Sequence, residues 1–481
     1  GPPRSLFPPT PRPTKMRGAS AAGSVQINDN KSTPVGVLSP PDPSVAVDAT
    51  DGVVLMTWNT GMAYSTDGGA HFTTVNLFTP QPGNPSRTSF FPSSYGGLCC
   101  DQVVIYLPQQ NMFVWLLQYW PVANAAGQIT QPNAQRIAWA RPADLRADFW
   151  NAWTWGDLTA NAVSGVSSGL GAANNEWVDY PDLAYSDQFL YVSTDRGWPD
   201  AVGSIYSDRR FVARLSLADM ANPASGVIHY GFAELTGAGV TKSHFVQNAP
   251  GRMVVGSLDD TSTMRIFTWT DASGSIPSVI VPISSITQGA NYTSVIPDAS
   301  DWVAVGFPGN ISGATYRRGR LAPGGEEYLF AFDAGVSGAG RPKAYVRLES
   351  LGPSGSGYAG TAEYDIWNPD FAFAMAGLGT NGNTDVPEIG LTVSVGGGTI
   401  GYPQSTVGYK DDFIVYVMTG STGSQMARFG DYFDTRPIPG PARMFGTALY
   451  DITVPVGSPV GSTCSTVACS ALVRYVEFGR P

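Results

Sequence analysis

Apolar and polar residues follow one short pattern that returns along the chain. Each copy has an Asp or His, a run in which apolar residues alternate with others, a tight turn, and a second apolar run. Alternation with a period of two is typical of half-buried strands, and repetition in a fixed phase indicates one supersecondary unit used many times. Copies begin at Asp42, Asp101, Asp182, His244 and Asp431, with a weaker one at Asp370 and a seventh near Glu326–Phe332.

The repeat predicts an all-β protein with the β-propeller fold, in which each copy forms one blade. A four-stranded blade needs about 40 to 45 residues, and most copies are spaced further apart, so several blades must carry insertions. We expect seven blades, with six as the alternative because the fifth copy is poorly marked. The predicted organisation is a Pro-rich extended leader over 1–40 and a single propeller domain over 41–481, with insertions at 121–175 and 309–325.

Both ends of the chain are expected to contribute to one blade. Terminal strands of closed propellers commonly pair with each other, so Ser470–Phe478 should meet a strand from the N-terminal side. Val25–Asn28 is the candidate for an edge strand within the leader.

The repeat also predicts where a site would form. The innermost strands of a propeller run along its central channel, so the residues just before them gather around one mouth of the channel. If each copy begins at the innermost strand, this mouth brings together Asp42, Asp101, Asp182, His244, Asp370 and Asp431. A phase error of one strand would place these residues along the rim instead.

Charge and composition narrow the class of partner. The formal net charge is −10, which argues against a nucleic-acid partner, because phosphate contacts need clustered Lys and Arg. No run approaches the roughly 20 apolar residues of a transmembrane helix. Few Lys and Arg, many Gly and Ser, and a plausible disulfide favour a secreted or periplasmic protein.

The four cysteines form two close pairs. We expect the adjacent Cys99 and Cys100 to form a vicinal disulfide, because free thiols are disfavoured in exported proteins. Two reduced, buried thiols are the alternative. The disulfide would present a rigid apolar surface at the mouth, directly before Asp101. Cys464 and Cys469 lie in a small polar hairpin that a disulfide can close, with metal ligation as the competing interpretation.

The densest polar and aromatic cluster is the segment NNEWVDYPD at 174–182. It supplies the carboxyl groups of Glu176 and Asp182 beside Trp177 and Tyr180. Cleavage of a glycosidic bond needs two carboxyl groups with separated pKa values, and aromatic rings stack against sugar faces. The alternative is a turn at the start of a blade, in which Asp caps the turn and Tyr fills the core.

A second cluster, RFGDYFDTRP at 428–437, contains Asp431, Tyr432 and Arg436. Arg presents a bidentate fork to a carboxylate, so this cluster could orient an acidic ligand. An Arg–Asp pair that ties neighbouring blades together is the competing interpretation. Arg196 is a further candidate of the same kind.

The segment STDGGAHF at Ser65–Phe72 resembles the Asp-box, the turn found in sialidase-like propellers. In that superfamily the Asp carboxylate accepts backbone N–H bonds within the hairpin, and the terminal aromatic ring packs below it, so the turn is a structural device. The resemblance implies a secreted propeller that acts on carbohydrate or binds it.

These observations predict a glycoside hydrolase or polysaccharide lyase that acts on an acidic glycan, either a polysaccharide or an oligosaccharide. The carboxyl groups of Asp101, Glu176, Asp182 and Asp431 are the acid and base candidates, and a lyase would use Tyr180 or His244 as its base. The expected substrate-binding residues are Trp177, Arg196, Tyr432 and Arg436.

Two other classes of function remain open. One is a non-catalytic glycan-binding or adhesion propeller, and the other is a redox propeller that uses the Cys99–Cys100 pair. We expect no required cofactor. A Ca²⁺ ion at Asp259–Asp260 or Asp411–Asp412 is compatible with the sequence, and so are solvated turns at both pairs.

Overall fold

The computed structural model describes residues 4–5, 26–30, 41–78, 89–91, 93–126, 129–159, 177–199, 205–241, 243–288, 292–297, 299–304, 310–336, 340–382, 386–411, 415–417, 421, 429–440, 443–454, 457–459 and 469–480. Their strands form seven sheets of four or five strands and one two-stranded hairpin. The seven sheets are the blades of a β-propeller, which confirms the predicted fold and the preferred blade number.

In blades 1 to 3 the strands follow one another from the innermost to the outermost in chain order. Blade 1 contains β3 (Ser44–Asp48), β4 (Val53–Trp58), β5 (Gly61–Ser65) and β6 (Thr73–Val75). Blade 2 contains β7 (Val103–Leu107), β8 (Met112–Tyr119), β11 (Ala134–Ala140) and β12 (Thr154–Thr159). Blade 3 contains β13 (Trp177–Tyr185), β14 (Phe189–Pro199), β15 (Ile205–Ser216) and β16 (Tyr230–Leu235).

Blades 4 to 7 also run from the innermost strand outward. Blade 4 contains β17 (His244–Phe245), β18 (Arg252–Asp260), β19 (Thr263–Thr270) and β20 (Ser278–Pro282). Blade 5 contains β21 (Ile311–Arg318), β22 (Glu326–Ala334), β23 (Tyr345–Ser354) and β24 (Gly357–Ile366), with β1 (Arg4–Ser5) added outside β24. Blade 6 contains β25 (Ala372–Thr380), β26 (Ile389–Gly397), β27 (Gly401–Tyr409) and β28 (Val415–Val417). Blade 7 contains β29 (Thr435–Pro437), β30 (Met444–Thr453), β31 (Ser470–Gly479) and β2 (Gln26–Asn30).

The few remaining elements lie between these strands. The hairpin of β9 (Val122–Ala123) and β10 (Ile129–Gln131) projects between β8 and β11 of blade 2. The helical segments are α1 (Pro142–Ala147), α3 (Leu217–Met220) and the 3₁₀ turns η2 (Pro223–Ser225) and η3 (Pro323–Gly325). Within the described residues, none of the helices has the length and apolar character needed to cross a membrane.

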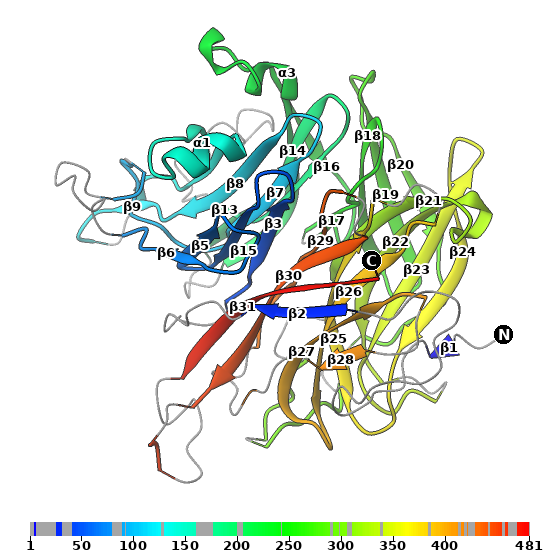
Figure 1. Ribbon diagram of the computed structural model, residues 1–481. Helices are drawn as coiled ribbons and strands as arrows, with labels where there is room; N and C mark the ends of the chain where they lie inside the picture. The colour runs from blue at the N-terminus through cyan, green and yellow to red at the C-terminus, as the bar shows by residue number, and fades with distance from the viewer. Residues whose placement is uncertain are drawn as a thin grey trace.

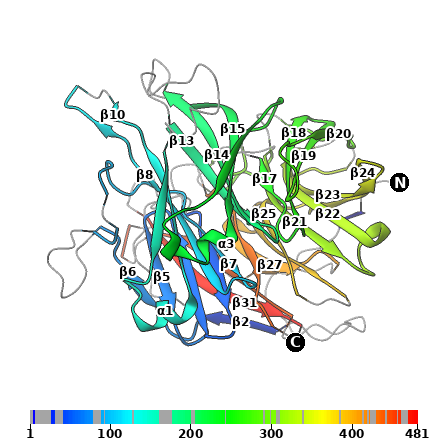
Figure 2. The same cartoon turned by 90° about the horizontal axis from the view of Figure 1, so that it is seen from above.

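The blades close into a ring. Each innermost strand contacts the innermost strand of the next blade, and β29 of blade 7 contacts β3 of blade 1. Figures 1 and 2 show the sheets following one another around the molecule in chain order, from the blue β3 to the red β31. Because all innermost strands run in the same direction, the residues that precede them lie at one end of the channel.

The two ends of the chain meet in blade 7. β2 pairs antiparallel with β31, from Gln26 opposite Gly479 to Asn30 opposite Tyr475 (Figure 1). The predicted edge strand within the leader and its predicted pairing with Ser470–Phe478 are therefore both confirmed.

The hydrophobic core lies between the blades. Between blades 1 and 2, for example, Leu55 and Met62 from blade 1 pack in one cluster with Phe113 and Trp115 from β8. Each sheet is thus covered on both faces, and β4 and β8 are buried at every position. The expectation of half-buried strands is wrong for these inner strands, because a neighbouring blade covers the face that alternation assigns to solvent.

Two segments differ from the predicted organisation. The fifth blade begins at Ile311, because β21 occupies much of the predicted insertion at 309–325, and Glu326 begins its second strand. The segment 121–175 contains the hairpin β9–β10 and α1, but also β11 and β12, the two outer strands of blade 2.

The Ser65–Phe72 turn joins β5 to β6. The Asp67 carboxylate accepts the backbone N–H of His71 at 2.9 Å, and it accepts the Ser65 hydroxyl at 2.7 Å. The backbone and side-chain hydrogen bonds from His71 hold the pKa of Asp67 well below its usual value. The Phe72 ring packs edge-on against Tyr475 of blade 7 at 5.7 Å. The turn therefore has the hydrogen bonding and packing of a structural device.

Candidate functional site

One hydrogen-bonded pair organises the channel mouth at the start of the innermost strands. The buried Asp42 carboxylate accepts the Asn59 amide at 3.1 Å and the backbone N–H of Asp431 at 2.7 Å. The Asn59 side-chain oxygen in turn accepts the backbone N–H of Asp101 at 2.8 Å. Asp42 and Asn59 thus fix the backbones of Asp101 and Asp431, whose side chains are only partly buried. We call these four residues the carboxylate clamp.

Three mouth residues share an unusual backbone. Asp42, Asp101 and Tyr180 have left-handed φ angles of 38°, 47° and 48°. A residue with a side chain pays a steric cost in this region, so the surrounding hydrogen bonds must hold it there. Strain of this kind is concentrated at ligand and active sites, which marks the start of blades 1 to 3 as a candidate site.

Two tyrosines adjoin the carboxylate clamp. The rings of Tyr180 and Tyr432 meet edge to face, with their centroids 6.1 Å apart. Burial, and then the charges of Asp101 and Asp42, raise the pKa of Tyr432 well above its usual value. Burial also raises the pKa of Tyr180. Both phenols therefore stay protonated at neutral pH. The buried Tyr432 hydroxyl has no hydrogen-bond partner among the described residues.

Asp182 and His244 form a second pair, which joins blades 3 and 4. Asp182 Oδ2 lies 2.8 Å from His244 Nδ1 and accepts the backbone N–H of Phe245 at 2.9 Å. Burial alone would raise the pKa of Asp182, but the opposing effects of His244, this N–H and Arg436 lower it overall. Asp182 is therefore ionised, and it ties blade 3 to blade 4. Ser44 ties blade 1 to blade 2 in the same way, because its hydroxyl accepts the Val104 N–H at 3.0 Å.

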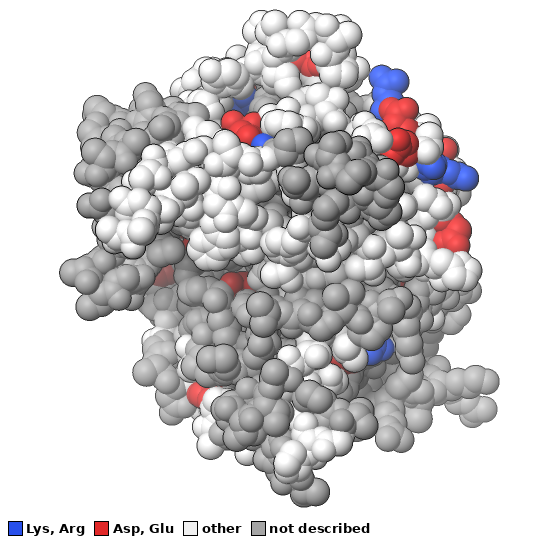
Figure 3. Space-filling model, turned by 90° about the vertical axis from the view of Figure 1, so that its left-hand side faces the viewer, with Lys and Arg blue, Asp and Glu red and all other residues white. Residues whose placement is uncertain are grey.

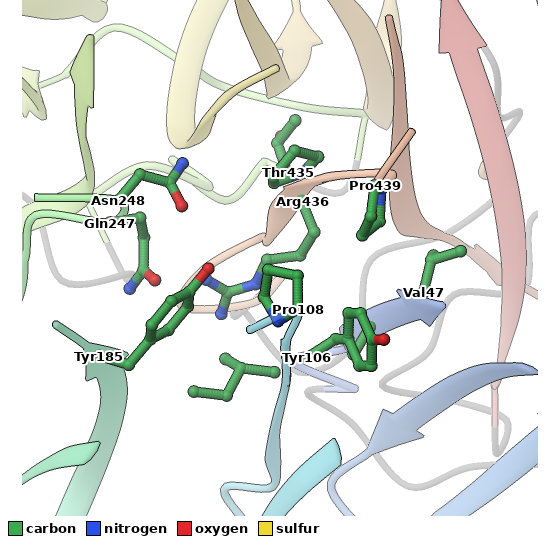
Figure 4. Close-up of a pocket in the computed structure, with 12 residues that line it drawn as sticks. Val47, Tyr106, Pro108, Tyr185, Gln247, Asn248, Thr435, Arg436 and Pro439 are labelled. Atoms are coloured by element: carbon green, nitrogen blue, oxygen red, sulfur yellow. The ribbon is translucent and has the colours of Figure 1, made fainter. Parts of the chain in front are cut away.

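Arg436 lies deeper in the channel than the carboxylate clamp. Its guanidinium pairs with Asp434 at 3.0 Å, and Asp434 also accepts the Ser44 hydroxyl. Arg436 lines a small cavity of about 50 Å³ together with Tyr185 and with Tyr106 near the end of β7. Figure 4 shows the Arg436 side chain reaching between Tyr185 and Pro108. The cavity therefore lies toward the other end of the innermost strands.

Cys99 and Cys100 form a disulfide, as predicted. Cys99 is buried and Cys100 is partly exposed. The Gln118 side-chain nitrogen lies 3.6 Å from Cys100 Sγ and donates to Asp179 Oδ1 at 2.9 Å. The disulfide is therefore next to the carboxylate clamp in sequence and linked to blade 3 through Gln118.

Arg196 lies on β14 directly opposite Arg209 on β15. Both side chains are partly buried, and Arg209 pairs with Glu234 at 3.2 Å. The Glu234 carboxylate therefore offsets part of the repulsion between the two guanidinium groups. The neighbouring residue, Arg210, is fully buried and structural: it binds the Tyr180 carbonyl and the Asp195 carboxylate, each at 2.9 Å.

The structure thus brings together three of the six residues that the sequence predicts for the mouth, while Asp182 and His244 form a separate pair. Asp42, Asp101 and Asp431 meet in the carboxylate clamp, whereas Asp370 is exposed and its backbone N–H binds Asn368 two residues earlier. Glu176 and Cys464 lie outside the described residues, and Cys469 is disulfide-bonded. Trp177 is buried and packs against Trp120 at 5.2 Å.

Sequence reasoning missed Asn59 and Gln118. Asn59 lies in the tight turn between β4 and β5, where Asn is common, so no local signal distinguishes it. Its role depends on a bond to Asp101, which is 42 residues away in the sequence.

The carboxylate pairs considered for Ca²⁺ are engaged in other contacts. Asp259 binds Arg265 at 2.6 Å, and Asp411 binds Arg317 at the same distance. Asp412 lies outside the described residues. Within the described part of the chain, no group of three or more His, Cys, Asp or Glu side chains is arranged to hold a metal ion.

Comparison with known proteins does not assign a family. No family model and no curated protein matches the chain. Among solved structures, the chain is similar to a leech intramolecular trans-sialidase, with 11% identity, coverage of 78% of this chain and 70% of the other, and a TM-score of 0.40. It is also similar to Trypanosoma rangeli sialidase, with 10% identity, coverage of 80% and 59%, and a TM-score of 0.37.

A third similar structure is the α-L-arabinofuranosidase of Lactobacillus brevis, with 11% identity, coverage of 67% of this chain and 93% of the other, and a TM-score of 0.33. The chain spans about three fifths of the length of the T. rangeli sialidase. Sialidases and another glycosidase are thus among the proteins that this propeller is similar to, while its own fold is established by its strand order.

Proposed function

We propose that this protein is an exported glycoside hydrolase that cleaves an acidic glycan at the channel mouth. The observation that carries the proposal is the carboxylate clamp, which fixes the backbones of two residues with partly exposed side chains, Asp101 and Asp431. Beside them lies the buried Tyr432 hydroxyl, which has no partner among the described residues. An unpaired buried hydroxyl costs about 1–3 kcal/mol, so a bound hydroxyl group or water that pairs with it is favoured.

The chemistry needs only these groups and water. One carboxyl group donates a proton to the glycosidic oxygen as the C–O bond breaks, and the other carboxylate accepts a proton from the attacking water or forms the glycosyl ester. Tyr180 and Tyr432 would donate hydrogen bonds, since both phenols stay protonated. Arg196 would pair with the negative charge of the glycan.

Elimination by a lyase fits this arrangement less well. A lyase needs a base, and the raised pKa of Tyr180 removes the phenolate that would serve in this role. His244 is the remaining base candidate, but its side chain is only 12% exposed and contacts Asp182.

The test is a panel of acidic and neutral polysaccharides, with product read as reducing ends and as absorbance near 235 nm, which detects the unsaturated product of a lyase. We expect reducing ends without this absorbance, and a loss of about 10²- to 10⁴-fold in kcat for Asp101→Asn and Asp431→Asn. Asp370→Asn is the matched control, because Asp370 is exposed and stands apart from the carboxylate clamp.

Other results would replace this proposal with a different one. Absorbance at 235 nm would establish a lyase and direct attention to His244. Binding without cleavage, unchanged in both variants, would establish a glycan-binding propeller. Failure to bind or cleave any member of the panel would contradict a carbohydrate function.

A further inference from the structure

A short ladder of hydrogen bonds holds Trp120 beside the Cys99–Cys100 disulfide. The Gly96 N–H donates to the Trp120 carbonyl at 2.9 Å, and the Trp120 N–H donates to the Gly97 carbonyl at 2.7 Å. The Cys99 N–H donates to the Gln118 carbonyl at 2.8 Å. The segment from Gly96 to Cys100 thus runs alongside the end of β8 and continues directly into Asp101 of the carboxylate clamp.

Trp120 is an exposed aromatic ring on a fixed support. It is 47% exposed, and its ring packs against the buried Trp177 at 5.2 Å with an angle of 47° between the ring planes. An isolated exposed apolar side chain is common on proteins and needs no explanation. This one is held by backbone bonds and by a second indole, so little conformational entropy would be lost if a ligand packed on it.

Apolar and polar groups lie next to each other around Gln118, two residues before Trp120. The partly exposed Cys100 adds an apolar sulfur surface, while Gln118 joins that sulfur to the partly exposed Asp179 carboxylate. Sites for small ligands combine apolar walls with a few fixed polar groups. A sugar ring offers both complements, an apolar face of C–H bonds and an edge of hydroxyl donors. Figure 3 shows few charged residues among the described atoms on the side of the molecule at the left of Figure 1. At the subsite itself, the Asp179 carboxylate would repel an acidic sugar, which favours a neutral one.

We propose that Trp120 and the Cys99–Cys100 disulfide form an outer subsite for a neutral sugar ring of the glycan that is cleaved at the carboxylate clamp. The ring stacks on Trp120, and its hydroxyl groups donate to Asp179. This inference rests on the proposed function and adds to it that the substrate is a glycan chain long enough to reach from Trp120 to the carboxylate clamp.

The experiment compares Trp120→Ala with the wild type on a size series of oligosaccharides prepared from the polysaccharide that the wild type cleaves. We expect KM to rise about tenfold or more for the long members, while kcat/KM for the shortest cleaved member stays unchanged. Trp155→Ala is the matched control: Trp155 is also exposed, at 40%, but it lies on β12 over Arg136, and we expect no change for any length.

A stacking role predicts a graded response. Trp120→Phe keeps a ring and should recover most of the affinity for long members, and near-ultraviolet circular dichroism with thermal unfolding shows whether each variant is folded. The inference is overturned if Trp120→Ala behaves as the wild type on every length, or if it loses activity equally on all lengths. If the Asp101 and Asp431 variants are inactive but the effect of Trp120→Ala does not depend on the length of the oligosaccharide, the proposed function stands and only this inference fails.

Discussion

At the scale of single residues, the mouth depends on side chains that do not face a ligand. Asp42 is buried and uses its two oxygens for two different bonds, one to Asn59 and one to the backbone of Asp431. It therefore positions the backbone of Asp431 directly and that of Asp101 through Asn59, while its own oxygens are engaged in these bonds. Substitution of this residue should separate positioning from the catalytic roles that we propose for Asp101 and Asp431.

The first prediction concerns Asp42→Asn. An amide has one acceptor oxygen, so either Asn59 or the Asp431 N–H loses its partner and the two carboxyl groups are less precisely placed. We expect kcat to fall about tenfold to a hundredfold with little change in KM, because misplacement affects the transition state more than the bound substrate. Steady-state kinetics on the cleaved polysaccharide measure this split, and an unchanged kcat would contradict the positioning role.

The second prediction concerns Arg210, a fully buried guanidinium between blades 3 and 4. It binds Asp195 and the Tyr180 carbonyl, and it also donates to the Ser243 carbonyl at 2.8 Å. Arg210→Met removes the cation that pairs with the buried Asp195 carboxylate, so the free energy of unfolding should fall by about 3–5 kcal/mol. Urea unfolding is the measurement. Arg318→Met is the control, because its pair with Glu326 is exposed and contributes about 0–1 kcal/mol.

At the scale of elements, β23 and β24 place two glutamates directly opposite each other. Glu349 and Glu363 are partners in the antiparallel register, and Glu349 is buried. Arg347 lies 3.6 Å from Glu363 and is itself paired with Asp365 at 2.5 Å. Burial, and then the charge of Glu363, raise the pKa of Glu349 to about 9, so blade 5 holds a proton at neutral pH.

The third prediction follows from this proton. The unfolded chain releases it near pH 4.5, whereas the folded protein keeps it until about pH 9. The contribution of Glu349 to the free energy of unfolding is therefore complete below about pH 4.5. It is lost as the pH rises from there to about 9, by up to about 1.4 kcal/mol per pH unit. Glu349→Gln should flatten this part of the stability profile, measured by urea unfolding from pH 5 to 9. Glu326→Gln on the same blade should leave the slope as it is.

The innermost strand of blade 5 shows why one blade was hard to find from the sequence. In blades 1 and 5, Ser44 and Ser312 accept a backbone N–H from the next blade, and in blade 3 Asp182 does so. Either residue type can make this bond. A search for the recurring Asp therefore misses the strand at Ile311–Arg318, where Ser312 makes the bond. The same search aligns Asp182 with Asp42, although Asp182 makes the bond to the next blade that Ser44 makes in blade 1.

Prediction of the site from the sequence was also limited, because its hydrogen bonds join residues from different blades. Alternation and repeat phase were enough to predict that Asp42, Asp101 and Asp431 share one mouth, because propeller geometry brings the starts of all innermost strands together. The hydrogen bonds that organise them join residues far apart in the sequence, such as Asn59 with Asp101. Such pairs leave no periodic pattern in the sequence, so the carboxylate clamp could be recognised only in the structure.

At the scale of the whole molecule, β2 completes blade 7 and so joins the start of the described chain to the last blade of the ring. This strand covers the outer edge of β31, and without it blade 7 would expose a row of unpaired backbone groups. Exposed strand edges favour pairing between molecules. The closure therefore contributes to both stability and solubility.

The fourth prediction is that deletion of residues 1–30 lowers the midpoint of thermal unfolding by at least about 5 °C and promotes aggregation. Deletion of residues 1–20 removes β1 but keeps β2, and it should have a much smaller effect. Calorimetry and light scattering on both shortened chains measure this difference. Equal behaviour of the two would show that β2 is not the closing element.

The pairing of β2 with β31 also sets an order of events during synthesis. A ribosome makes β2, which ends at Asn30, about 440 residues before β31, which begins at Ser470, so β2 waits for its partner while the strands between them are made. At about 5–20 residues per second this wait lasts tens of seconds. Blades 1 to 6 can form one after another as they emerge, but blade 7 stays incomplete until β31 has been made. Docking of β2 onto β31 therefore follows the synthesis of every strand of blades 1 to 6.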